Sequence, residues 1–208
     1  MSKKASKPRI KAVLFDLGKV LLHFDFDPAF RRLARHCDRS PKDIEAFFIQ
    51  SGVEVLYDGG RISSRKFYEN VKKALGLRLG FHDFRSAWNH VFTPIKPMVR
   101  LLASLRRRHR LVLISNTNAM HFEYAKSRYS FLKHFHRHVL SYKVKARKPD
   151  ERIYRIAVRA CRATPAEIFY IDDRADLTQA ASELGLHTFT FKNNPKELMG
   201  VMKALNIL

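Results

Sequence analysis

The stretch Val13-Leu14-Phe15-Asp16-Leu17-Gly18-Lys19-Val20 decides the fold. A short apolar run bounded by a turn signal is typical of a buried strand in a parallel sheet. Such sheets bind ligands outside the carboxyl ends of their strands, so Asp16 is predicted at a strand tip, where its carboxylate can face a site. Taken alone, the stretch is better explained by a carboxylate that only caps the next turn. A site is favoured because three later stretches repeat the design of an apolar strand followed by polar residues.

The composition indicates two units of different character. With 208 residues, 46% of them hydrophobic, the chain fits one domain with an insertion or two small domains. The net charge of +21 divides into +5 over 1–24, +3 over 25–90 and +13 over 91–208. Such a surface attracts polyanions, so nucleic acid is a possible partner. However, no nucleic-acid-binding motif accompanies the charge, and a solvated basic face explains it better.

The sequence indicates a cytoplasmic protein that forms a monomer or dimer and does not enter a membrane. No apolar run approaches the roughly 18–20 residues of a transmembrane helix, and residues 1–11 lack the apolar core of a signal peptide. Residues 1–9 are predicted to be a disordered basic arm. Cys37 and Cys161 have no metal-binding or disulfide spacing, so both are expected to be reduced, packed thiols.

Strands and helices alternate over most of the chain, which predicts an α/β fold with a doubly wound parallel, Rossmann-like sheet. The expected core domain spans 10–24 and 93–208, and its helices include one opened by Pro149 and running to Cys161. The predicted strands cover residues 10–15, 111–114, 138–141, 168–171 and 187–191.

Residues 25–92 are expected to form a small all-helical cap inserted after the first strand. A segment over 19–26 that alternates apolar and polar residues predicts a short flap or hairpin leading into it. Four helices are predicted, the first with Asp27 as its N-cap and Pro28 at its first position. Trp88 and Phe84, at helical spacing, are expected in the core of the cap. The other three helices are predicted to begin near Ser40-Pro41, at Ser63 or Ser64, and near Phe81.

Four strand or helix ends carry polar groups, and a parallel sheet brings these ends to one edge. They are Asp16, Ser115-Asn116-Thr117, Lys148 and Asp172-Asp173. Carboxylates that share a dry site repel one another, and Mg²⁺ relieves the repulsion while also binding substrate phosphate. Ser115 and the backbone N–H groups near Asn116 suit anionic oxygens, and aspartate is a competent phosphoryl acceptor. The set therefore predicts phosphoryl transfer.

The motifs resemble those of the haloacid dehalogenase (HAD) superfamily of hydrolases. The resemblance rests on Phe15-Asp16-Leu17-Gly18-Lys19-Val20, Ile114-Ser115-Asn116-Thr117, Lys148-Pro149 and Ile171-Asp172-Asp173. The helical insertion lies where the family's C1 cap is placed. Within the family, Ser-Asn-Thr-Asn and Arg-Lys-Pro-Asp resemble a branch of phosphatases that includes bacterial glucose-1-phosphatase. Asp172-Asp173 argues against the metal-free dehalogenase branch, since unneutralised carboxylates would oppose the nucleophile.

The resemblance implies a Mg²⁺-dependent phosphatase that acts on a small phosphorylated metabolite, such as a sugar phosphate. It implies Asp16 as the nucleophile that forms an aspartyl phosphate, with Lys148 as its catalytic partner. Phosphate contacts are expected from Ser115, Asn116, Leu17 and Gly18. The implied metal ligands are Asp16, the Gly18 carbonyl and Asp173, supported by Asp172.

Gly18 departs from the pattern of most family phosphatases, which have a general acid two residues after the nucleophile. Such an acid is typically worth about 10²–10⁴ in rate. Asp25 or His23 of the predicted flap, or a water, are the candidate substitutes, although helix entry and flap packing explain both residues as well. A second departure is Leu177, which stands where the family has a polar residue.

Two other classes of function remain open from the sequence. A HAD-fold protein that lost its acid at Gly18 could act as a binding or regulatory protein without catalysis. The second alternative is a protein that binds polyanions through its positive charge, and its binding would depend steeply on salt concentration.

Overall fold

The structure is a computed structural model that describes residues 9–208, so the basic arm predicted over residues 1–9 lies almost wholly outside the described residues. Five parallel strands form the central sheet, in the order β5-β4-β1-β6-β7. Strand β1 lies in the middle, and the chain leaves it in both directions, which confirms the predicted doubly wound α/β fold. The strands are β1 (Ala12–Phe15), β4 (Arg110–Ser115), β5 (Arg137–Leu140), β6 (Ile168–Asp172) and β7 (His187–Thr190).

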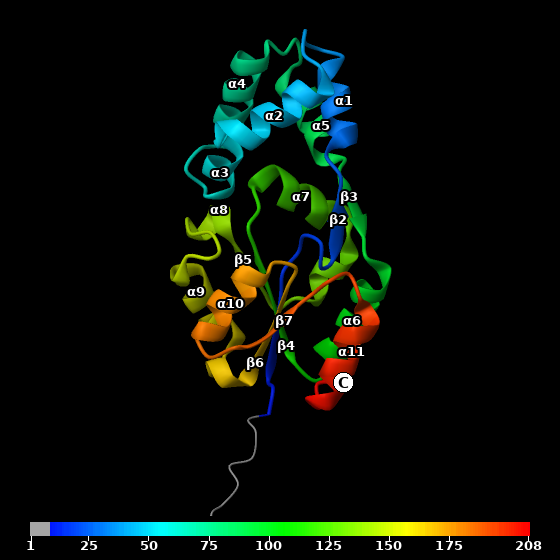
Figure 1. The fold of residues 1–208 in the computed structure, drawn as a ribbon, viewed down its shortest axis with the longest axis vertical. Coiled ribbons are helices and arrows are strands. Elements are labelled where there is room, and N and C mark those ends of the chain that lie inside the picture. The colour runs from blue at the N-terminus through cyan, green and yellow to red at the C-terminus, as the bar shows by residue number, and fades with distance from the viewer. Residues whose placement is uncertain (1–8) are drawn as a thin grey trace, which may run out of the picture.

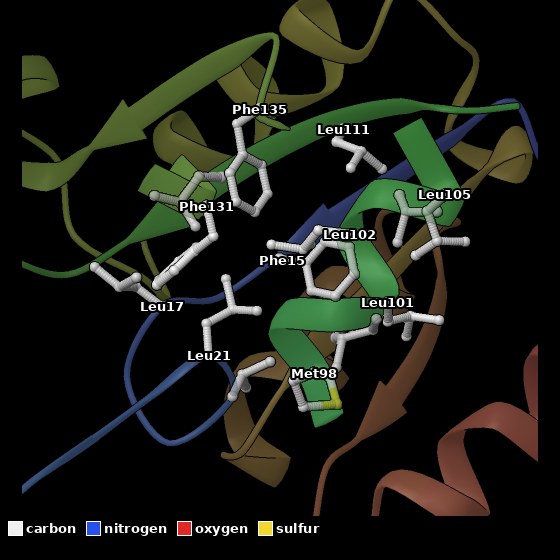
Figure 2. Close-up of a cluster of buried hydrophobic side chains, with 14 of the residues drawn as sticks. Phe15, Leu17, Leu21, Met98, Leu101, Leu102, Leu105, Leu111, Phe131 and Phe135 are labelled. Atoms are coloured by element: carbon white, nitrogen blue, oxygen red, sulfur yellow. The ribbon is translucent and has the colours of Figure 1, made fainter. Parts of the chain in front are cut away.

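Helices cover both faces of this sheet (Figure 1). Successive strand residues point to opposite faces, so Val13 and Phe15 pack in one buried cluster while Ala12 and Leu14 pack in another. Figure 2 shows the first cluster, where the ring of Phe15 lies among side chains from the sheet and its covering helix. One face carries α6 (Lys96–Arg106) and α11 (Pro195–Ala204), and the other carries α9 (Glu151–Cys161) and α10 (Ala175–Glu183).

The insertion between the first and second strands of the sheet is helical and has a hydrophobic core of its own, in which Trp88, Phe84 and Phe67 are buried. It contains five helices rather than the four predicted. The additional helix, α3, follows α2 after a single residue, Gly52, which adopts a left-handed conformation with φ 65°. The helices are α1 (Asp27–Ala34), α2 (Pro41–Ser51), α3 (Val53–Asp58), α4 (Ser64–Leu75) and α5 (Phe81–Asn89).

Two short strands connect the insertion to the sheet. Strand β2 (Leu22–Phe24) pairs antiparallel with β3 (Phe92–Pro94), so the predicted flap is extended but its partner lies at the far end of the insertion. The prediction of Asp27 as the N-cap of α1 is wrong, since Phe26 occupies the cap position. The Asp25 carboxylate accepts a hydrogen bond from the Asp27 N–H at 3.0 Å and satisfies that helix end instead.

Cys37 and Cys161 are both buried free thiols, as predicted. None of the helices in residues 9–208 combines the length and the apolarity that crossing a membrane requires.

Candidate active site

The polar residues that follow β1, β4 and β6 meet at one edge of the sheet. Phe15 is in register with Leu113 on one side and with Ile171 on the other. The three strands therefore end together, and Asp16, Ser115 and Asp172 leave the sheet at the same edge. Helices α1–α5 stand above this edge in Figure 1.

Lys148 joins the two aspartates. Its Nζ lies 2.8 Å from Asp16 Oδ1 and 2.5 Å from Asp172 Oδ2. All three residues are buried, with 4% of Lys148, 8% of Asp16 and none of Asp172 exposed. Asp16 is thus the most accessible of the three.

Asp172 is held by several donors at once. Besides Lys148, the Tyr170 hydroxyl donates to Oδ2, and the Arg174 N–H donates to Oδ1 at 3.0 Å. A carboxylate with this many donors is fixed in position. Asp172 therefore orients Lys148 and is poorly placed to contact a substrate itself.

The charges of the cluster are strongly coupled. Burial raises the pKa of Asp16 to about 7, and the nearby Asp172 charge adds to this, while Lys148 opposes it. Burial alone would lower the pKa of the Lys148 ammonium, but the two carboxylates outweigh burial and raise it. The lysine is therefore a permanent cation, and one ammonium does not fully compensate two buried carboxylates.

Asn116 positions the backbone of Lys148. Its Nδ2 donates to the Lys148 carbonyl at 3.0 Å, and its Oδ1 accepts from the Lys148 N–H at 2.8 Å. The Asn116 side chain is thereby occupied, so any contact with phosphate is left to its backbone. The prediction that Pro149 opens helix α9 is wrong, because the helix begins at Glu151 and Asp150 is its N-cap.

The site can accommodate a metal ion. Carboxylate oxygens of Asp16, Asp172 and Asp173 lie within 4.8 Å of one another. Burial and the Asp172 charge raise the pKa of Asp173, as they do that of Asp16, so a second and third negative charge are costly beside Asp172. Oxygen donors with excess negative charge are the ligand set that Mg²⁺ prefers. The donor chemistry therefore fits the expected ion.

Gly18 is closely approached by the ring of Phe24. A Cβ atom on residue 18 would lie 2.9 Å from Phe24 Cε1, too close without a shift of the ring. Phe24, on β2, therefore occupies the space into which a side chain at position 18 would extend.

A cavity of about 350 Å³ opens between the sheet edge and the helical insertion. Leu17, Gly18, Ser115 and Asn116 form its floor, so the four residues predicted to contact phosphate line a single space. The insertion adds aromatic side chains, including Phe26 and Phe48, and two carboxylates. These carboxylates belong to Glu54 and Asp58.

Sequence reasoning missed four polar residues of this cavity: Glu54, Asp58, His121 and Arg147. The only local signal in the sequence is Asp58-Gly59-Gly60, which indicates a turn and nothing more. Asp58 Oδ1 accepts from Asn118 Nδ2 at 3.0 Å, and its other oxygen lies 4.0 Å from Arg147 Nη2. Burial raises the pKa of Asp58 to about 6 despite these partners.

The two candidate substitute acids lie elsewhere. His23 is exposed on β2. Asp25 lines a neighbouring depression next to Lys19, and its carboxylate binds the start of α1. The structure places neither residue in the wall of the cavity that contains Gly18 and Ser115.

Ser141, which directly follows β5, connects the insertion to the loop after β4. Ser141 Oγ accepts from the Thr117 N–H at 2.9 Å and donates to the Asp58 carbonyl at 2.6 Å. At Gly60, where φ is 66°, a Cβ atom would lie 2.1 Å from the Tyr142 carbonyl oxygen. These contacts hold α3 and the turn after it against Ser141 and Tyr142, and Ser141 in turn binds the loop after β4.

Comparison with known proteins identifies relatives of this arrangement. The family model described as haloacid dehalogenase-like hydrolase matches residues 10–185. A HAD family enzyme from Bacteroides thetaiotaomicron, solved with magnesium and inorganic phosphate, is 27% identical, with a TM-score of 0.79 over 88% of this chain and 94% of that chain. A predicted HAD-like family hydrolase from Porphyromonas gingivalis is 25% identical, with a TM-score of 0.80 over 94% and 98% of the two chains. L-2-haloacid dehalogenase from Xanthobacter autotrophicus, at 19% identity and a TM-score of 0.64 over 94% and 82%, shares the fold.

Proposed function

The chain belongs to the haloacid dehalogenase-like hydrolase family, and we propose that it is a Mg²⁺-dependent phosphatase of a small phosphorylated metabolite, such as a sugar phosphate. The single observation that carries the proposal is the buried bridge from Lys148 to Asp16 and Asp172, with Asp173 beside it. The relative solved with magnesium and inorganic phosphate supports the same chemistry.

In the proposed reaction Asp16 is the nucleophile. Its carboxylate attacks the phosphorus of the bound ester and forms an aspartyl phosphate as the alcohol leaves, and water then releases phosphate and restores the carboxylate. Lys148 holds Asp16 in position and balances negative charge that develops on the transferred group. Ser115 and the backbone of Leu17, Gly18 and Asn116 are proposed to bind the phosphate oxygens.

Mg²⁺ is proposed to bind at Asp16, the Gly18 carbonyl and Asp173, with Asp172 in support. When bound, it neutralises phosphate charge and polarises the phosphoryl oxygens. Its binding also relieves the repulsion among carboxylates that face a single ammonium.

The helical insertion is proposed to select the substrate. In this proposal residues 10–24 and 93–208 form the catalytic domain, and residues 25–92 form a cap over the phosphate-binding floor. The cavity of about 350 Å³ lies between the two, and aromatic rings from the cap line it. The part of the substrate that is not phosphate would contact these rings.

A panel of sugar phosphates and one chromogenic aryl phosphate, assayed with and without Mg²⁺, tests the proposal. We expect turnover that requires Mg²⁺ and that Asp16→Asn abolishes. Asp83→Asn, at an exposed aspartate of α5, is the matched control and should retain activity. Turnover that survives Asp16→Asn, or its absence from the wild type, would refute the proposal. Phosphate binding without turnover would instead identify a binding or regulatory protein.

A further inference from the structure

We infer that Glu54, on cap helix α3, is the general acid that protonates the leaving alcohol, in place of the acid absent at residue 18. The inference rests on the proposed phosphatase function and adds a substrate class to it. An enzyme with such an acid is suited to phosphate esters of alkyl alcohols, whose alkoxides are poor leaving groups without a proton.

The usual position for the acid is blocked in this fold. Phe24 occupies the space beside Gly18, and the ring itself is held against Phe26 at 5.8 Å between centroids. The proton must therefore come from another wall of the cavity. Restoring an acid at residue 18 would require the ring of Phe24 to shift.

Glu54 lies in the cavity wall, on the cap side of the phosphate-binding floor. It lines the same cavity as Gly18 and Ser115. Asp58 is the other carboxylate from the cap, but Asn118 and Arg147 already engage it. Within residues 9–208 no hydrogen bond reaches the Glu54 carboxyl, so it is free to meet a substrate oxygen.

The surroundings of Glu54 favour its protonated form. Burial raises its pKa to about 7, the charge of Asp58 adds to this, and Arg147 opposes it. An acid with a pKa near the working pH is the most effective proton donor. Glu54 also lines the neighbouring depression that contains Asp25. The other titratable groups that line these two spaces are His121, Lys19, Asp25, Asp27, Lys42 and Glu45.

The proposed step balances as follows. The bond between phosphorus and the ester oxygen breaks while the bond from Asp16 to phosphorus forms, and the Glu54 proton moves to the departing oxygen. The Glu54 carboxylate then takes a proton from the water that attacks the aspartyl phosphate. The bond between Asp16 and phosphorus breaks, which releases phosphate and restores the Asp16 carboxylate. Glu54 is again a carboxylic acid.

First-turnover kinetics with two ester types tests the inference. Nitrophenolate leaves without a proton, whereas an alkoxide does not. For Glu54→Gln we expect alcohol release from an alkyl phosphate in the first turnover to fall by about 10²–10⁴-fold. The first-turnover release of nitrophenol from the aryl phosphate should be unchanged. In the wild type, the rate with the alkyl ester should decline as the pH rises through about 7, and Glu54→Gln should lose this decline.

Controls separate this role from a structural one. Glu69→Gln, at an exposed glutamate of α4, should behave as the wild type with both esters, and thermal unfolding should show that Glu54→Gln is folded. Equal loss with both esters, or no loss with either, would overturn the inference. A loss specific to the alkyl ester in Asp25→Asn but not in Glu54→Gln would assign the acid to Asp25. A wild type that releases only nitrophenol would overturn the inference but not the phosphatase function, whereas failure with both esters would overturn the function.

Discussion

The buried His121 should make this protein less stable in acid. Its Nε2 lies 3.2 Å from the Trp88 carbonyl, and its Nδ1 lies 3.2 Å from Asn118 Nδ2. The Asn118 amide is oriented by its Oδ1, which accepts from the His121 N–H at 3.0 Å. Nδ1 therefore faces an N–H₂ donor and must accept. A second proton on the ring would place two donors against each other in a buried site.

The size of the stability loss follows from the pKa of the His121 ring. Burial lowers the pKa of His121 from 6.5 to about 4, although the Trp88 carbonyl opposes this. Between these two values the unfolded chain binds a proton that the folded chain does not, so stability falls as the pH decreases through this window. A difference of this size corresponds to about 3 kcal/mol, because each pKa unit is worth about 1.4 kcal/mol. Below pH about 4 the loss from this residue is complete.

Urea unfolding of the wild type and His121→Gln, measured between pH about 7 and about 4, isolates this contribution. Glutamine can still donate to the Trp88 carbonyl but cannot gain a proton. The variant should be the less stable protein at neutral pH. The difference in free energy of unfolding between the two proteins should shrink by about 3 kcal/mol at pH about 4. Contributions from Asp16 and Glu54 are common to both proteins and cancel in the difference. A gap that stays constant across the window would refute the reasoning.

Three further outcomes are expected. Gly60→Ala should destabilise more than Gly76→Ala in chemical denaturation: both glycines have positive φ, but only at Gly60 does the added methyl meet a carbonyl, that of Tyr142. Lys148→Met should lower stability by about 3–5 kcal/mol, since it leaves buried carboxylates without their cation, and a variant as stable as the wild type in denaturant would contradict this. Mg²⁺ should raise the thermal unfolding midpoint of the wild type and EDTA should reverse it, whereas Asp173→Asn should respond less; equal responses would exclude Asp173 from the metal site.

Much of the candidate active site was predictable because its residues are marked by local sequence patterns. Asp16 and Asp172 each follow a short run of apolar residues, and a buried strand is the best explanation of such a run. Parallel pairing then brings their ends together whatever the details of packing. Lys148 was recognised by its place in the motif pattern, although its role as a bridge between two carboxylates depends on distances that sequence does not contain.

The helical insertion was less predictable because fewer of its residues are marked by a local sequence pattern. Its helices α2 and α4 have clear N-caps at Ser40 and Ser63. Helix α3 is six residues long and follows α2 after one glycine, too short for a periodic pattern to show. The residues that it contributes to the cavity, Glu54 and Asp58, therefore had no signal beyond a turn.

The sequence by itself determined the parallel sheet, the alternation of strands and helices along the chain, and the edge at which Asp16, Lys148 and the paired acids Asp172 and Asp173 lie. These follow from short-range patterns and from the general rules of parallel sheets. Only the tertiary structure decided what faces that edge. The pairing of β2 with β3 brings Phe24 beside Gly18, and the packing of α3 on the loop after β4 brings Glu54 into the cavity. Contacts between segments so far apart in the chain depend on the packing of the whole cap, which no local pattern encodes.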